Sequence, residues 1–538
     1  MWKNKIIKEC LILYATIIAI ISLASCKKTL LEVDLKGWNL VIITIDAVDH
    51  KRLGCYGGEE WTTPFLDSLA KQGLLIEYAY CPTGSTAPSH ASMLTSLLPE
   101  RHGCASNGNP IDPRTWNLPG ALLERGYETI GWTRAFFMSK ENNFARGFKY
   151  FYSKPYSNPS DENTEKDCNL TDIKQIRAFF EKSDMSRPFF AWLHLKGGHW
   201  PLVPIDSKYL SRNGMTSSPE KLPPVPMNMD SKLEYLSSDS PINNDSPYLE
   251  QLRKYYDCNL SEMDDALRSI MGFFESEGKI DNTLFVIAAD HGETFENGII
   301  GQHAPSPYES TMRIPIILWT SVKGIMGGER IDDRIVSIAD IAPTVLRLLG
   351  FGDVFPEKLD GLDILAKTNK RYSIQGSFSG TYLYEYEISK WKELRVDQNK
   401  TREESQAYWN MAEKTEKEQW IYYVQYQYDS LSRIIMKLIY TQAGPYKYRI
   451  PPKRQLFNLS QDPREKIDLL TRGAEFGNIA QDLFDELRRT RPLAGWTTDL
   501  IKSPFDLPDL STKAEFLSRQ LKLDEVTIER LKSLGYLR

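Results

Sequence analysis

The chain has 538 residues, of which 41% are hydrophobic and 25% charged, and its formal net charge is −5. This length allows one large core or two domains, and the composition is typical of a soluble globular protein. The mildly acidic balance argues against a nucleic-acid partner, because such partners bind strongly basic surfaces.

The first 26 residues differ from the rest of the chain. The lysine-rich head MWKNKIIKEC precedes the apolar run LILYATIIAIISLASC, which is too short for a full membrane span. Its ending, Leu23 to Cys26, resembles a bacterial lipobox, in which the cysteine is lipidated. We therefore expect a lipoprotein signal over residues 1–26 and a lipid anchor that holds the protein to a bacterial membrane, in the periplasm or at the cell surface. A plain signal peptide and an uncleaved anchor are the alternatives.

Residues 27–368 are expected to form an α/β domain. Apolar runs predict strands at 38–45, 188–195, 282–292 and 314–320, and helical stretches near 62–73 and 248–278 lie between them. This alternation is typical of a mainly parallel sheet flanked by helices. The stretch 201–248 is rich in Pro, Ser and Asn and predicts a long surface excursion.

The composition changes near residue 370. Tyrosine-rich alternating runs such as EQWIYYVQYQYDSLSRIIMKLIYT, separated by turn residues, predict an antiparallel sheet. Residues 369–538 are therefore expected to form a smaller C-terminal α+β subdomain with terminal helices.

Two aspartates follow directly on buried strands. Asp46 ends the run WNLVIITI, and Asp290 ends TLFVIAA with His291 beside it. Ligands of parallel sheets bind where strands end, so these side chains should lie on one rim. Carboxylates and imidazoles brought together from distant segments suit a divalent metal, and these ligand types are compatible with Ca, Mg, Mn or Zn.

The segment CPTGSTAPSHASMLTSLLPERHG is unusually rich in hydroxyl residues around one proline. Ser89, just after this proline, is expected to cap a helix that begins near Ala91. A nucleophile placed just before such a helix would face an anionic ester favourably, because the amide groups there point toward negative charge.

Several segments, taken in chain order, match one known family. VIITIDAVDHKRLGCYG is its early strand, and TAPSHASMLTS fits the signature C-x-P-S-R-x-x-x-L-T-G with Thr86 at the cysteine position. Further matches are GYETIGWT, ARGFKYF, RPFFAWLHLKGGHWP, TLFVIAADHGE, YESTMRIPIIL, VSIADIAPTVLRLLG, DGLDIL, QLFNLSQDPREKIDLL and LKSLGYLR. From about residue 38 to the C-terminus, the chain resembles the sulfatase family of the alkaline phosphatase superfamily. The resemblance implies an alkaline-phosphatase-like fold and ester hydrolysis.

The resemblance also implies roles for four residues. Sulfatases oxidise the signature Cys or Ser to formylglycine, but the Cβ methyl of Thr86 would allow only a ketone. We therefore predict Thr86 as an unmodified nucleophile, as in the phosphodiesterase and phosphotransferase branches of the superfamily. A metal at its hydroxyl oxygen would lower the pKa of that hydroxyl. Asp46, Thr86, Asp290 and His291 are the predicted metal ligands.

Three histidines complete the predicted site. His90 replaces the signature arginine and is expected to donate to a transferred oxyanion. His199 is predicted to act as general acid or as donor to the leaving oxygen, and His303 is predicted to face the substrate. Relatives often carry Asp-Pro where this chain has Gly197 and Gly198, so we expect one metal rather than two. His194, His199 and His303 could still supply nitrogen ligands to a second metal.

The sequence thus predicts an exported, metal-dependent hydrolase. It would cleave a sulfate or phosphate ester of a small molecule or glycan through Thr86, with phosphodiester or phosphonate chemistry favoured. One alternative is a formylglycine-independent sulfuric ester hydrolase acting on glycans. The other is a non-catalytic glycan-binding surface lipoprotein, against which the retained ligand positions argue.

Overall fold

The computed structural model covers two parts of the chain. It describes residues 33–366, with gaps at 105–106, 108, 136, 154–168, 200–201, 203–205, 216–246, 297–298, 304–307, 353–354 and 356–357. In the C-terminal part it describes residues 373–379, 419–428, 434–442, 454–473 and 475–490.

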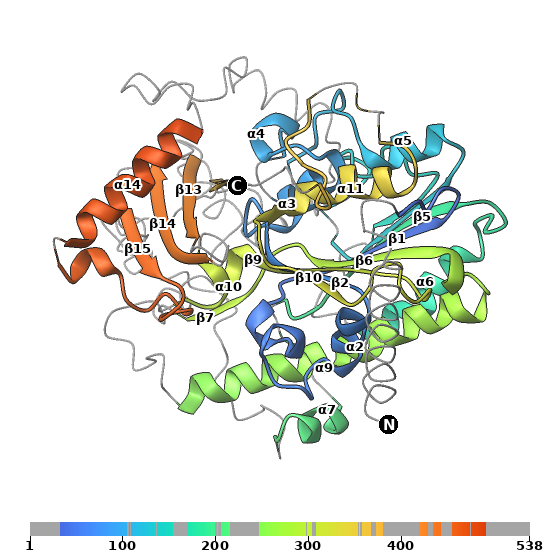
Figure 1. Ribbon diagram of the computed structural model, residues 1–538. Helices are drawn as coiled ribbons and strands as arrows, with labels where there is room; N and C mark the ends of the chain where they lie inside the picture. The colour runs from blue at the N-terminus through green and yellow to red at the C-terminus, as the bar shows by residue number, and fades with distance from the viewer. Residues whose placement is uncertain are drawn as a thin grey trace, which may run out of the picture.

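A nine-stranded, mainly parallel sheet lies at the centre of the molecule (Figure 1). Its order is β10-β2-β9-β6-β1-β5-β3-β4, with β11 also paired to β2, and β9 runs antiparallel to β2 and β6. The strands are β1 (Asn39–Ile45), β2 (Leu74–Tyr80), β3 (Glu128–Thr133), β4 (Tyr150–Ser153), β5 (Phe189–Leu195), β6 (Thr283–Ala289), β9 (Arg313–Trp319), β10 (Glu329–Ile331) and β11 (Val336–Ser337). A hairpin of β7 (Thr294–Glu296) and β8 (Ile299–Gln302) follows β6.

Helices cover both faces of this sheet (Figure 1). One face carries α3 (Thr86–Thr95), α4 (Pro99–His102), α5 (Leu118–Glu124) and α11 (Ile341–Leu348). The other carries α2 (Pro64–Gln72), α6 (Asn169–Phe180) and the long α9 (Pro247–Ser276), and α7 (Ser207–Arg212) packs against α9. The short helix α10 (Glu309–Met312) leads into β9, and single 3-10 turns span His50–Arg52, Gly54–Tyr56, Ile280–Asn282, Ile338–Asp340 and Leu469–Thr471.

The central strands are buried on both sides, as continuous apolar runs require. All seven residues of β1, β5 and β6 are buried, and burial stabilises each large apolar side chain by about 1.5–3 kcal/mol. In the parallel registers, Ile45 of β1 pairs with Leu195 of β5 and with Ala289 of β6. The three strands therefore end at the same level, and the residues that follow them share one rim.

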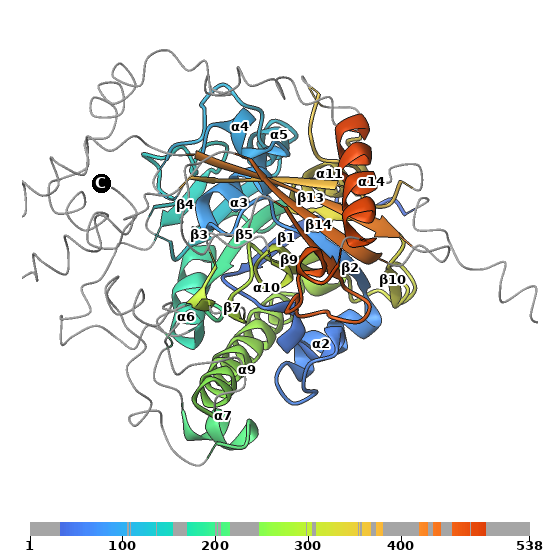
Figure 2. The ribbon, with the colours of Figure 1, turned by 90° about the vertical axis from the view of Figure 1, so that its left-hand side faces the viewer.

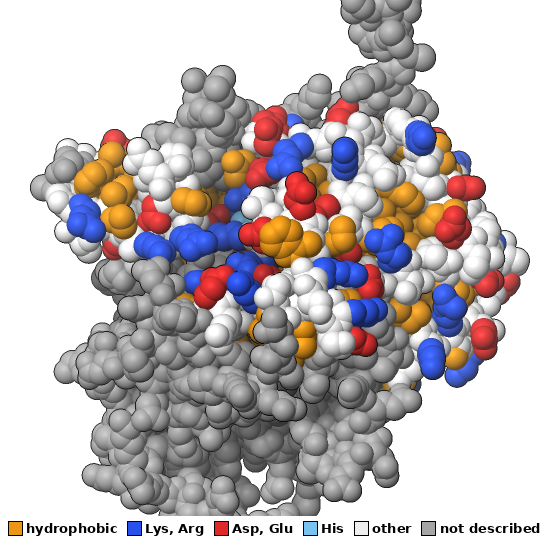
Figure 3. Space-filling model, turned by 90° about the horizontal axis from the view of Figure 1, so that it is seen from below, with side chains coloured by type: hydrophobic (Ala, Val, Ile, Leu, Met, Phe, Trp, Pro, Cys, Tyr) orange, Lys and Arg blue, Asp and Glu red, His pale blue; other side chains and the backbone are white. Residues whose placement is uncertain are grey.

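A second, antiparallel sheet lies at the C-terminal side. It has the order β12 (Ser373–Ser379), β13 (Gln419–Tyr428), β14 (Ile434–Gln442), β15 (Arg454–Asn458). Helix α14 (Glu475–Thr490) packs on it (Figure 2) through Leu483 and Phe484, against Met436 and Leu456. Basic and acidic side chains are interspersed over the described part of the face in Figure 3, with a row of basic side chains on the left of the view.

The predicted fold class is confirmed, including the antiparallel C-terminal sheet. The signal at 1–26 and the boundary between 368 and 369 lie outside the described residues and stay predictions, as does most of the excursion at 201–248. Among the described residues, no helix has the length and apolar character needed to cross a bilayer. The expected helix start near Ala91 is wrong. Helix α3 begins at Thr86, and the Ser89 hydroxyl donates to the Asp290 carbonyl at 2.6 Å instead of capping.

Candidate functional site

Three of the predicted metal ligands meet at the rim of the sheet. Asp46 follows β1, and Asp290 and His291 follow β6. His291 Nε2 lies 3.4 Å from Asp46 Oδ1 and 3.5 Å from Asp290 Oδ2. The other oxygen of Asp290 accepts hydrogen bonds from the backbone N–H groups of Ala47 and His291, at 3.2 and 2.9 Å, and these fix the carboxylate.

Thr86 lies within the same group as the first residue of helix α3. The N-cap residue of this helix, Ser85, has an extended backbone. The hydroxyl of Thr86 is fully buried and lies 3.2 Å from His291 Nε2. The Nδ1 atom of His291 contacts the Gly292 carbonyl at 2.9 Å, and because a carbonyl only accepts, Nδ1 carries the hydrogen. In the neutral ring, Nε2 therefore offers a lone pair toward Thr86 Oγ1 and the two carboxylates.

The charges at this site fit a cation. Asp46 Oδ1 and Asp290 Oδ2 are buried and accept no hydrogen bond from the described part of the chain. Burial raises the pKa of Asp290. Burial lowers the pKa of His291, but the facing carboxylates of Asp290 and Asp46 outweigh it, so the pKa is raised above its ordinary value. Two ligand atoms that share an ion at about 2.0–2.2 Å each lie roughly 3–4 Å apart, which matches the observed separations. Asp46, Asp290 and His291 are thus suited to hold a divalent metal.

His90 contacts the backbone of Thr86. Its Nδ1 contacts the Thr86 carbonyl at 2.8 Å, its Nε2 contacts the Thr44 hydroxyl at 2.8 Å, and the side chain is fully buried. Burial lowers its pKa to about 3, so the ring is neutral at pH 7. With both nitrogens bonded to protein atoms, this arrangement gives no support to the predicted contact between His90 and a transferred oxyanion.

His199 and His303 flank the group on its open side. The ring of His303 stacks on that of His291 with centroids 4.3 Å apart, and the His199 ring lies 4.9 Å from His303. His303 Nδ1 also lies 3.3 Å from the buried carboxylate of Glu293. Burial lowers the pKa of His199 to about 3, which favours a neutral hydrogen-bond donor over a charged acid.

Close backbone packing explains the two glycines before His199. A Cβ on Gly197, whose φ is +59°, would lie 2.2 Å from the Asp46 carbonyl oxygen. A Cβ on Gly198 would lie 2.3 Å from the ring of Tyr256, whose hydroxyl donates to the Ala47 carbonyl at 2.6 Å. The neighbouring atoms leave no room for the side chains of Asp-Pro at these two positions.

Sequence reasoning missed several residues of the site. Thr44 stands two residues before Asp46 on β1, and its hydroxyl contacts both His90 and His194. Lys196 follows β5, where burial lowers its pKa to about 7 and its ammonium group donates to the His199 carbonyl at 2.8 Å. The alternation of sides along a strand could have indicated Thr44, because it lies on the same side of β1 as Asp46.

The chain is similar to known sulfatases. The family model described as Sulfatase matches residues 38–351. An ulvan-active sulfatase of Formosa agariphila is 21% identical over 91% of this chain and 86% of its own length. An N-acetylglucosamine-6-O-sulfatase of Bacteroides thetaiotaomicron is 21% identical over 62% of this chain and 71% of its own length.

A solved structure, that of the phosphonate monoester hydrolase of Agrobacterium radiobacter, has the same fold. The TM-score is 0.58 at 16% identity, covering 84% of this chain and 94% of that chain. The family model spans the central sheet together with the strand ends that carry Asp46, Asp290 and His291, so more than half of the chain is matched. The chain therefore belongs to the sulfatase family of the alkaline phosphatase superfamily and is an ester hydrolase of that family.

Proposed function

We propose that the chain is a metal-dependent hydrolase that uses the unmodified hydroxyl of Thr86 as its nucleophile. The observation that carries this proposal is the convergence of Thr86 Oγ1 on His291 Nε2 at 3.2 Å, with carboxylate oxygens of Asp46 and Asp290 at 3.4 and 3.5 Å from the same nitrogen. A hydroxyl in contact with a cation-binding group is the arrangement that activates a weak oxygen nucleophile.

The residues of the chain would act in two displacements. Asp46, Asp290 and His291 would hold the cation, which lowers the pKa of the Thr86 hydroxyl and neutralises charge on the transferred group. Thr86 Oγ1 gives its proton to water and bonds to sulfur or phosphorus, and the bond to the leaving oxygen breaks. That oxygen takes up a proton from water and departs as an alcohol. The His199 ring, whose centroid lies 6.4 Å from that of His291, would donate a hydrogen bond to it. Water then cleaves the Thr86 ester and restores the hydroxyl.

The substrate class we favour is a phosphodiester or phosphonate ester. Thr86 cannot form the aldehyde that formylglycine chemistry needs, because its Cβ carries a methyl group. A sulfated glycan is the alternative substrate, and the sugar sulfatase among the relatives favours it. His303 would face either group, and its ring contacts with His199 and His291 support this role.

The proposal is tested with the full-length protein and three aryl esters: a sulfate, a phosphate monoester and a phosphodiester, each with metal supplied and with metal removed by a chelator. We expect metal-dependent turnover of the diester. If only the sulfate ester is turned over, the substrate is a sulfate ester and not an ester of phosphorus. No turnover of any ester, with glycan binding that survives chelation, would indicate a non-catalytic binding protein.

We also propose that the protein is exported and anchored by lipid on Cys26, on the evidence of the sequence of residues 1–26. In a bacterial host fed a labelled fatty acid, the wild type should carry label and sediment with membranes. The Cys26→Ala variant should lose the label. Unlabelled wild-type protein would contradict the anchor.

A further inference from the structure

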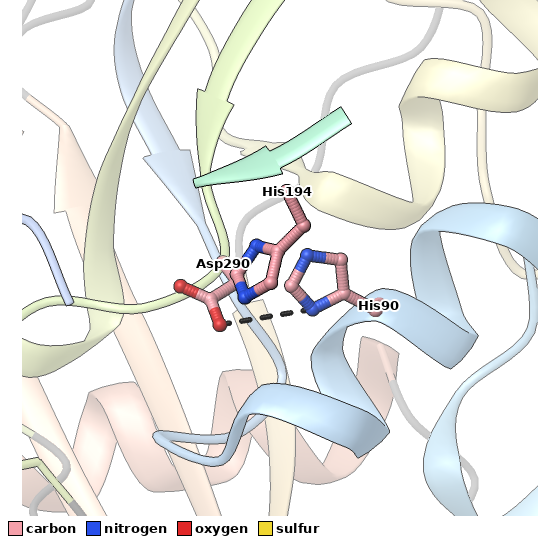
Figure 4. Close-up of side chains that lie close together, drawn as sticks. All are labelled: His90, His194 and Asp290. Atoms are coloured by element: carbon pink, nitrogen blue, oxygen red, sulfur yellow. Dashed lines mark ion pairs between the residues drawn. The ribbon is translucent and has the colours of Figure 1, made fainter. Parts of the chain in front are cut away.

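A buried network below the rim joins four side chains from two strands and one helix. The Thr44 hydroxyl of β1 lies 2.8 Å from His90 Nε2, 3.1 Å from His194 Nδ1 and 3.0 Å from the indole nitrogen of Trp192. Figure 4 shows the rings of His90 and His194 beside Asp290, with His90 from α3 and His194 from β5. The exposed fraction of His194 is 1%, so the network is closed to solvent.

Hydrogen bonding fixes which nitrogens carry hydrogen. His90 Nδ1 donates to the Thr86 carbonyl, so the Nε2 atom of this neutral ring must accept, and the single hydroxyl hydrogen of Thr44 goes to it. The Thr44 oxygen then has two lone pairs, and the indole N–H of Trp192 fills one of them. His194 Nδ1 must therefore donate to the other.

The consequence is an unprotonated Nε2 on His194. This atom receives no hydrogen bond from the described part of the chain and lies 3.6 Å from Asp46 Oδ2. A nitrogen lone pair that faces a carboxylate in a dry interior is unfavourable unless a positive charge lies between them. The same Asp46 carboxylate presents its other oxygen to His291 Nε2. Asp290 belongs to two groups of ligand atoms that lie within 4.8 Å of one another, one with His90 and His194 and one with Asp46 and His291.

We propose that His194 is an additional ligand of the metal centre, opposite His291 across the Asp46 carboxylate. His90 and Thr44 are positioning residues, because they set the hydrogen on the far nitrogen of His194 and leave Nε2 with its lone pair directed at the carboxylates. This inference rests on the metal centre of the proposed function and extends it. The ligand set becomes two imidazoles and two carboxylates, together with the Thr86 oxygen.

Such a set selects among metals. Imidazole nitrogen suits zinc, cobalt and other transition metals, whereas calcium and magnesium prefer oxygen ligands throughout. The proposal therefore predicts that the protein prefers Zn²⁺ or Co²⁺ to Ca²⁺ and that His194 contributes to this preference.

The experiment is a titration of the metal-free, full-length protein with Co²⁺, followed by visible absorption, and with Zn²⁺ and Ca²⁺ by calorimetry. His194→Leu should weaken Co²⁺ binding at least about tenfold, with a smaller effect on Ca²⁺. His102→Leu is the matched control, because His102 is equally buried but both of its nitrogens are hydrogen-bonded, to Ser92 and to the Cys104 N–H. It should retain wild-type affinity within about twofold.

A measurement on the wild type keeps the test independent of how the variants fold. X-ray absorption of the Co²⁺-loaded protein should report two imidazole ligands, and one imidazole would overturn the role of His194. Equal Co²⁺ affinity in wild type and His194→Leu would overturn it as well, while leaving the proposed function intact. A wild type that binds none of the three metals would overturn both.

Discussion

A buried ion cluster joins the central domain to the C-terminal antiparallel sheet, and Lys437→Met should disrupt it. Lys437 on β14 is fully buried, and its ammonium nitrogen lies 2.8 Å from Glu309 Oε1 and 2.8 Å from Glu465 Oε1. Glu309 also accepts from the hydroxyls of Tyr80 and Tyr426 at 3.0 and 3.1 Å. Burial raises the pKa of Glu465, and although burial alone would raise that of Glu309 too, Lys437 outweighs it and holds the pKa below its ordinary value.

The structure sets the size of the effect. Without Lys437, two carboxylates would share one dry site, and Glu465 would relieve the repulsion by taking up a proton. Protonating a group with an unfolded pKa near 4.3 costs about 3–4 kcal/mol at pH 7, in the range of about 3–5 kcal/mol for breaking a buried ion pair. Because the folded variant then holds a proton that the unfolded chain lacks, the deficit should shrink by about 1.4 kcal/mol per pH unit between pH 7 and 5.

Urea unfolding of the wild type and Lys437→Met at pH 5, 6 and 7 measures this deficit. Lys208→Met is the control, because Lys208 is more than half exposed and its contact with Asp265, at 3.4 Å, should be worth about 0–1 kcal/mol. The double variant Lys437→Met/Glu465→Gln should recover part of the loss. A deficit no larger than that of Lys208→Met, or one that does not change with pH, would refute the reasoning.

Two further predictions concern the central domain. Burial raises the pKa of Asp264 to about 6, so the folded protein holds a proton that the unfolded chain releases near pH 4. Relative to Asp264→Asn, the wild type should therefore lose about 2–3 kcal/mol of unfolding free energy between pH 4 and 7. If chemical denaturation showed the same difference in unfolding free energy between the two proteins at every pH, this prediction would be wrong. Gly197→Ala should lower both stability and metal affinity, because the added Cβ would collide with the Asp46 carbonyl. Gly214→Ala is the control, since Gly214 also has a positive φ (+68°) but has open space around it. It should cost only about 1–2 kcal/mol of stability and leave metal binding unchanged. Equal metal affinity in these two glycine variants would show that the contact with Asp46 does not matter.

The strands and their terminal aspartates could be predicted because the signal is local. Seven-residue apolar runs that end on Asp46 and Asp290 carry both the strand and the rim position in one short segment. The network around His194 could not be predicted, since it depends on the pairing of Thr44 with His194, which are 150 residues apart and adjacent in the β1–β5 register. The sequence of each strand predicts which of its side chains share one face of the sheet. It does not predict which strand pairs with it.

The ion cluster that joins the central domain to the C-terminal sheet is even harder to predict from neighbouring residues in the sequence. Glu309 and Lys437 are 128 residues apart, and a lysine within an alternating strand is typical of a solvent face. Helix α3 begins at Thr86 and not near Ala91 for a different reason. Ser89 has the type expected of an N-cap, but a longer-range partner, the Asp290 carbonyl, takes its hydroxyl.

The most direct test of the central claim is whether the transferred group bonds to Thr86. Metal-loaded protein is mixed with an aryl phosphodiester during turnover and quenched in acid, and its peptides are analysed by mass spectrometry. The account predicts the mass of the transferred group on the peptide that contains Thr86, with neither adduct nor turnover in Thr86→Ala. Turnover that leaves Thr86 unmodified and persists in Thr86→Ala would contradict it.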